Sequence, residues 1–161
     1  MDLEQERALI DPEILELHDA IENGNVELAK EKLDKVPLNA TGVDGDTALH
    51  LACLYGMKEI VDLLIQRGED VNATDQEGST PLHDACAGGY FEIVSALLEA
   101  KAAVNVADSD NDTPLHNATN GDHIKVVQLL LSAGADKKAE NDAGETPEML
   151  AHDDSVKACF V

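Results

Sequence analysis

The chain has 161 residues, of which 33 are Asp or Glu and 11 are Lys or Arg, so its formal net charge is −22 at pH 7. An acidic excess of this size repels nucleic acid and anionic membrane surfaces, and we expect neither as a partner. Aromatic residues make up only 2% of a chain that is 43% hydrophobic, which predicts a single core built from Leu, Ile, Val and Ala.

The cysteines and the first residues indicate a reducing compartment. Cys53, Cys86 and Cys159 form no C-x-x-C pair, and the first ten residues lack the basic and apolar segments of a signal peptide. No stretch approaches the roughly 20 apolar residues of a membrane-spanning helix. We therefore expect a soluble monomer in the cytoplasm, with the nucleus as an alternative location.

Two short helices are predicted near the N-terminus. Asp11 followed by Pro12 is a typical helix start, because proline in the first turn needs no amide partner. Apolar residues recur at helical spacing, first at Ile14, Leu17, Ala20 and Ile21, and then at Val26, Leu28, Ala29 and Leu33. Pro37 is expected to end the second helix.

A period of 33 residues dominates the rest of the chain. It is carried by four threonines, which are Thr47, Thr80, Thr113 and Thr146. The first of them begins Thr-Ala-Leu-His and the next two begin Thr-Pro-Leu-His; an alanine follows each threonine after five residues and a Leu-Leu pair follows each of the first three. Each full period predicts two helices of about 8–10 residues, and helices this short bury their apolar faces only when the units stack.

This pattern resembles the ankyrin-repeat family, whose mark is T-P-L-H-x-A at a 33-residue period. The resemblance implies an all-α solenoid of stacked helix-turn-helix units with short β-hairpin turns and a concave face. It divides one domain into an N-terminal arm and capping repeat at 1–42, ankyrin repeats at 43–75, 76–108 and 109–141, and a truncated C-terminal capping repeat at 142–161.

Several residues depart from the pattern and predict weak points. Lys101 replaces the glycine found at Gly68 and Gly134, where a left-handed backbone would strain it. Asp122 also stands where Gly56 and Gly89 stand, and the pair Lys137-Lys138 replaces a Val-Asn pair. The last repeat is expected to be covered by four apolar residues, namely Met149, Leu150, Val156 and Phe160.

Catalytic, metal and cofactor motifs give no support for an enzyme. His50-x-x-Cys53 and His83-x-x-Cys86 could hold a soft metal, but the resemblance implies that these histidines bond backbone and that the cysteines fill the core. Asp108-x-Asp110-x-Asp112 resembles the start of a calcium loop but lacks its later ligands. We expect no metal or cofactor and expect the carboxylates, including Asp84, to lie in water at ordinary pKa values.

The resemblance implies that a partner protein is bound by the hairpin tips and the first helix of each repeat. The residues expected to bind it are Asp44, Asp46, Leu51, Leu54, Tyr55, Glu77, Asp84, Asp110, Asp112, Asn117, Asn120 and Glu145. The acids favour a partner with a basic or mixed surface, and the apolar residues would anchor it. The function expected is an adaptor or scaffold; the alternative is a regulatory inhibitor that docks on an enzyme such as a kinase and blocks it.

Two alternatives remain open at single residues. Asn72 and Asn105 stand at the position that is hydroxylated in some ankyrin repeats, so they are candidate modification sites. The tail Cys159-Phe160-Val161 either caps the core or presents its carboxylate to a PDZ groove.

Overall fold

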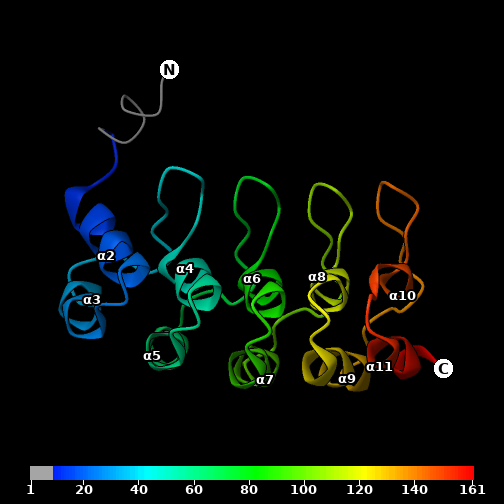
Figure 1. Ribbon diagram of the computed structural model, residues 1–161. Coiled ribbons are helices and arrows are strands. Elements are labelled where there is room, and N and C mark those ends of the chain that lie inside the picture. The colour runs from blue at the N-terminus through cyan, green and yellow to red at the C-terminus, as the bar shows by residue number, and fades with distance from the viewer. Residues whose placement is uncertain (1–8) are drawn as a thin grey trace.

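The computed structural model describes residues 9–161, and the expected arm at residues 1–8 lies outside the described residues. The helices run in the order α2 (Pro12–Glu22), α3 (Val26–Leu33), α4 (Ala48–Leu54), α5 (Lys58–Arg67), α6 (Pro81–Ala87), α7 (Phe91–Glu99), α8 (Pro114–Asn120), α9 (Ile124–Ser132), α10 (Pro147–Leu150), α11 (Asp154–Lys157) and the 3-10 helix η1 (Ala158–Phe160). Figure 1 shows successive helix pairs in a row, with a projecting hairpin before each of α4, α6, α8 and α10. The predicted all-α solenoid is confirmed.

The helix starts agree with the sequence signals. The Asp11 side chain accepts a hydrogen bond from the Glu13 amide at the start of α2, and threonines precede α4, α6, α8 and α10. Helix α3 ends at Leu33, earlier than the expected stop at Pro37. None of the helices within residues 9–161 combines the length and apolar content needed to cross a bilayer.

A threonine–histidine bridge joins each repeat to the next. The Thr47 amide donates to Nδ1 of His50 at 3.2 Å, and Nε2 of the same ring lies 3.1 Å from the Ser79 carbonyl oxygen. Because Nδ1 accepts, Nε2 carries the proton and donates to the next repeat. The same bonds recur at His83 and His116, and the buried residues between them form one continuous core.

The projecting segments are hairpin-like loops. In each one a backbone amide bonds a carbonyl across the turn, as from Gly42 to Asp46 at 2.9 Å and from Asp75 to Ser79 at 3.0 Å. An isolated antiparallel bridge joins Thr41 and Thr47, and no strand is formed within residues 9–161. Hydrogen bonds within each loop and to the neighbouring loop hold the loops in place without a β-sheet.

The C-terminal cap differs in part from expectation. Val156 and Phe160 are buried, as predicted, and the Lys137 ammonium donates to the Phe160 carbonyl at 2.9 Å. Met149, in contrast, is 68% exposed, and Leu150 is only half-buried. The burial of Phe160 favours the capping role of the tail over presentation to a PDZ groove.

Asp122 strengthens the structure where the sequence predicts a weak point. Its φ is 53°, as a glycine position requires, but its Oδ1 accepts the amides of His152 at 2.9 Å and Asp153 at 3.0 Å. The bond from the Asp153 amide is the main reason why the pKa of this carboxyl is lowered. The prediction that Asp122 is merely a poor replacement for glycine was therefore wrong, because the carboxylate ties the C-terminal segment to the preceding repeat.

We expect Asp122→Ala to loosen the C-terminal cap selectively. The change removes the acceptor of two backbone amides, so hydrogen exchange should accelerate in α11 and η1 and stay unchanged in α4. Asp122→Asn keeps one acceptor oxygen and serves as the control, with a smaller effect. Equal exchange in all three proteins would contradict this role.

Lys101 adopts the strained backbone that its position predicts. Its φ is 72°, close to the 88° of Gly68 and the 91° of Gly134 at the equivalent turns. We expect Lys101→Gly to raise the free energy of unfolding by about 0.5–1 kcal/mol, since relief of left-handed strain exceeds the added entropy of the unfolded glycine. Chemical denaturation measures this.

Gly134→Ala is the matched control for Lys101→Gly. A Cβ at residue 134 would meet no heavy atom within 4 Å, so only backbone strain would change. It should destabilise the protein by about 1 kcal/mol. If both variants shift stability in the same direction, backbone strain is not the cause.

Candidate protein-interaction surface

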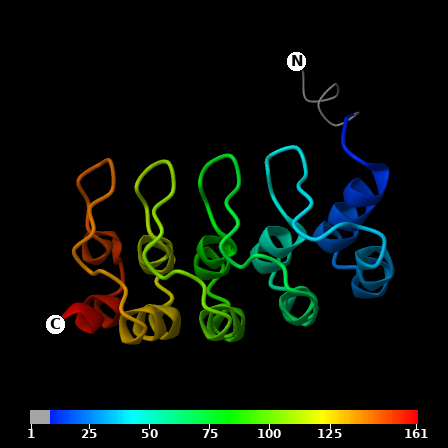
Figure 2. The ribbon, with the colours of Figure 1, turned by 180° about the vertical axis from the view of Figure 1, so that it is seen from behind.

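The surface of interest, called here the inner face, consists of the four hairpins and the helices that follow them. The hairpins span residues 41–47, 74–80, 107–113 and 141–146, and each leads directly into α4, α6, α8 or α10. Figures 1 and 2 show that all four hairpins project from the same side of the row, away from α5, α7 and α9. Residues at matching positions of successive repeats therefore come to lie side by side.

Backbone bonds tie the hairpin tips into a row. The Gln76 amide donates to the Asp44 carbonyl at 3.1 Å, and the Ser109 amide donates to the Glu77 carbonyl at 2.8 Å. The Asp142 amide repeats the contact with Asp110 at 2.9 Å. The spacing between carboxylates at the tips is thus fixed before any partner arrives.

One residue closes each of the last three hairpins. Oδ1 of Asp75 accepts the amides of Glu77 and Ser79 at 2.8 and 2.9 Å, and Asp108 makes the equivalent bonds. Asn141 does the same in the fourth hairpin. The motif Asp108-x-Asp110-x-Asp112 is therefore a turn built on Asp108. The recurrence of Asp, Asp and Asn five residues before the repeat threonines could have revealed this role from the sequence.

The twelve residues expected to bind a partner all lie on the inner face, but at different depths. Six are exposed: Asp44, Leu54, Tyr55, Glu77, Asp110 and Asn120. Five are half-buried: Asp46, Asp84, Asp112, Asn117 and Glu145. The remaining one, Leu51, is buried.

Leu51 corrects the predicted apolar anchor. It is only 6% exposed, because it packs into the core under α2 and the first hairpin. Leu54 and Tyr55, one turn further on, are 46% and 47% exposed at the end of α4. The equivalent positions in the next two repeats carry Ala, Gly or Asn, so this apolar pair is particular to the first full repeat.

Asp84 contradicts the expectation that the inner carboxylates lie in water. Its Oδ2 is buried and has no hydrogen-bond partner within residues 9–161. Burial, aided by the nearby charges of Asp46 and Asp75, raises the pKa of Asp84 to about 8. Burial also raises the pKa of Asp46. At neutral pH Asp84 is thus mostly a neutral acid that can donate as well as accept a hydrogen bond.

Within residues 9–161 the bases are confined to the outer layer of the solenoid, whereas acids occur in both layers. The segments 12–22, 41–54, 74–87, 107–120 and 141–150 contain no Lys or Arg, although each contains at least two carboxylates. The bases of the described residues lie in or after the outer helices, where Lys30 pairs with Glu59 at 2.5 Å and Lys58 pairs with Asp62 at 2.5 Å. The negative potential of the inner face is therefore not neutralised by neighbouring bases.

The histidines and cysteines are used by the fold. Both ring nitrogens of His50, His83 and His116 are hydrogen-bonded, so neither is available to a metal. Cys53 and Cys86 are buried, and burial raises the pKa of both thiols. Within residues 9–161 no three His, Cys, Asp or Glu side chains are grouped so as to hold a metal ion.

The amide side chains of Asn72 and Asn105 also bridge repeats. Asn72 accepts the Ala103 amide at 2.7 Å and donates to the Lys101 carbonyl at 3.4 Å, and Asn105 makes the same contacts with Asp136 and Gly134. Both asparagines, whose β-carbons would be the atoms hydroxylated, are exposed residues. Hydroxylation there stays a prediction.

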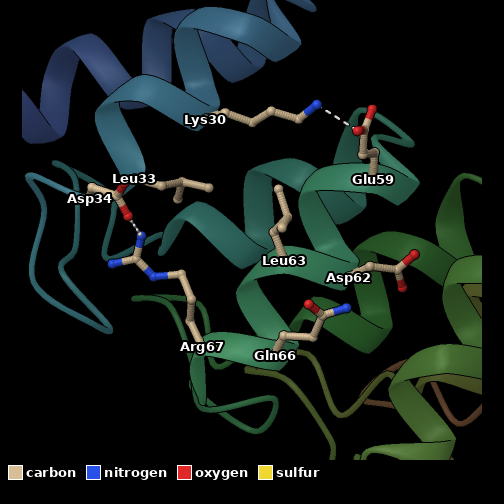
Figure 3. A pocket seen from close by; sticks show the side chains of 8 residues that line it. All are labelled: Lys30, Leu33, Asp34, Glu59, Asp62, Leu63, Gln66 and Arg67. Carbon is tan, nitrogen blue, oxygen red and sulfur yellow. Dashed lines mark hydrogen bonds and ion pairs between the residues drawn. The ribbon is translucent and has the colours of Figure 1, made fainter.

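A hollow on the opposite side of the molecule differs in character from the inner face. It holds 540 Å³ between α3 and α5. Figure 3 shows Leu33 and Leu63 between two ion pairs, Lys30–Glu59 and Arg67–Asp34. Its charges are already paired, so it offers a partner less electrostatic attraction than the inner face.

Comparison with known proteins agrees with this architecture. The family model described as ankyrin repeats (3 copies) matches residues 17–108 and 59–141. An ankyrin repeat protein of Fowlpox virus (strain NVSL) is 44% identical over 54 residues, which cover 33% of this chain and 38% of the viral protein. The similarity to the viral protein thus spans less than half of either chain.

We expect Asp84→Asn to stabilise the protein at alkaline pH. The folded protein keeps a proton that the unfolded chain releases, so stability conferred by wild-type Asp84 falls as pH rises from the ordinary pKa of 3.8 through about 8. Asparagine stands at the same position of the next repeat, at Asn117. The variant should gain about 1–3 kcal/mol at pH 9 and less at pH 5, measured by urea denaturation.

Asp110→Asn is the control for Asp84→Asn, because its carboxylate is exposed at a hairpin tip. It should change stability little and equally at both pH values. A gain for Asp84→Asn that does not grow with pH would contradict the burial of its charge.

Proposed function

The chain belongs to the ankyrin-repeat family, whose repeats are protein–protein interaction modules, and we propose that its inner face binds a basic segment of another protein. One observation carries this proposal: the hairpins and first helices hold carboxylates without a single Lys or Arg. A surface of one sign attracts an oppositely charged partner and speeds its approach.

The apolar pair Leu54 and Tyr55 gives the proposed interface an anchor. Tyrosine is among the residues that contribute most when an interface buries them, and Tyr55 is half-exposed at the end of α4. Charge at the tips would then set the rate of association, while the buried aromatic contact would set the rate of dissociation.

The proposed role is that of an adaptor or scaffold. It requires no catalytic group, metal or cofactor, and one copy of the chain suffices. A cytoplasmic or nuclear location belongs to the same proposal.

The test is the kinetics of binding to a partner isolated by affinity capture and mass spectrometry. Glu77→Gln combined with Asp110→Asn should slow association and flatten its salt dependence, because two exposed charges are lost. Tyr55→Ala should speed dissociation, with a loss of about 2 kcal/mol or more if the side chain is a hot spot.

Asp62→Asn is the control, because Asp62 lies on the outer hollow away from the inner face. It should bind as wild type does. If it abolishes binding while the inner-face variants bind normally, the partner uses the outer side and the proposed function is wrong.

A further inference from the structure

A small pocket lies at the N-terminal end of the inner face. It is formed by α2, the first hairpin and α4, and its volume is 120 Å³. This is well below the roughly 300–1,000 Å³ of pockets for drug-sized ligands. The pocket therefore fits the end of one long side chain.

His18 lines this pocket, and one of its ring nitrogens is unsatisfied. The residue is only 7% exposed, and its Nε2 is buried without a hydrogen-bond partner within residues 9–161. The Nδ1–Cε1 edge lies against Gly42 of the hairpin, where an added Cβ would come within 2.8 Å of Nδ1. Buried polar atoms are nearly always paired, so this nitrogen calls for an explanation.

The repeats show what His18 lacks. His50, His83 and His116 each follow a threonine by three residues and use both ring nitrogens to bridge repeats. Leu15 occupies the position three residues before His18, so no threonine is there to bond the ring. His18 is therefore free of the structural role that occupies the other buried histidines.

Carboxylates surround the pocket. Glu22 comes from α2, Asp44 and Asp46 come from the hairpin, and no Lys or Arg is among the lining residues. Leu15, Val43 and Leu51 supply apolar wall. Acidic groups beside apolar walls suit a side chain with a hydrocarbon stem and a cationic end.

We propose that this pocket receives one arginine side chain of the bound protein, with the guanidinium donating to the His18 imidazole and to the carboxylates of Asp44 and Asp46. The proposal rests on the proposed function and names its recognition element. Arginine fits because its five N–H donors serve several acceptors at once, whereas lysine presents a point charge.

The charge state of His18 is compatible with a cationic occupant. Burial lowers its pKa to about 4, against the opposing charge of Asp19, while His50 lowers it further. The imidazole is thus neutral at pH 7 and keeps one nitrogen lone pair to accept an N–H. A protonated ring would instead repel the guanidinium.

The test uses an acetylated, amidated octapeptide with a single arginine among glycines and serines, added to the isotope-labelled full chain at pH 7. NMR should show saturable shifts of the His18 ring and the Gly42 amide. The matching citrulline peptide has the same shape without the charge and should cause none. Equal shifts with both peptides would overturn the proposal.

Two matched variants separate this pocket from general attraction to an acidic face. Asp44 and Asp110 each stand three residues before a repeat threonine and are exposed, but only Asp44 lines the pocket. Asp44→Asn should weaken the arginine peptide about tenfold, and Asp110→Asn by less than about threefold. Equal losses would overturn the pocket and leave the acidic face as a binding surface.

His18→Phe keeps an aromatic ring, which is slightly larger than the imidazole, and removes both nitrogens, so it should also weaken the arginine peptide while the chain melts cooperatively. Unchanged peptide binding in this variant would exclude the imidazole as an acceptor. Glu77 and Tyr55 lie outside the pocket, so the kinetic experiment on the captured partner decides the proposed function independently.

Discussion

The structure depends on one constraint: a helix of seven to ten residues cannot bury its apolar side alone. The first helix of each full repeat has 7 residues and the second has 9 or 10, so every core surface is completed by a neighbouring repeat. The imidazole bridge at His50, His83 and His116 fixes how neighbours meet, because one ring bonds its own repeat and the carbonyl of the next. Register, hairpin spacing and the inner face all follow from these contacts.

The stacking of repeats was predictable from the sequence because its signals are local and periodic. A threonine and a histidine three residues later identify the start of the first helix in each full repeat, with proline after the threonine in two of the three, and glycines mark the turns. Lys101 was correctly assigned to left-handed backbone because glycines occupy the equivalent positions of two other repeats.

The depth of particular side chains was not predictable from periodicity. A helical position shows which way a residue points along its own helix, but Leu51 is covered by α2 and a hairpin that the period does not describe. The carboxyl group of Asp84 is likewise shielded from water by neighbouring elements. Asp122 gains its role from amides 30 residues further on, and no local pattern indicates that contact.

The backbone bonds between hairpin tips have a consequence for how such a chain can change in length. In each bridge the histidine and its acceptor carbonyl are 29 residues apart, and tip contacts recur at 32 residues. An insertion inside one repeat would move a donor away from its acceptor on both sides. Gain or loss of a complete 33-residue unit leaves every spacing intact. Natural length variation should therefore occur in whole repeats, and a protein engineer could lengthen the inner face by the same step.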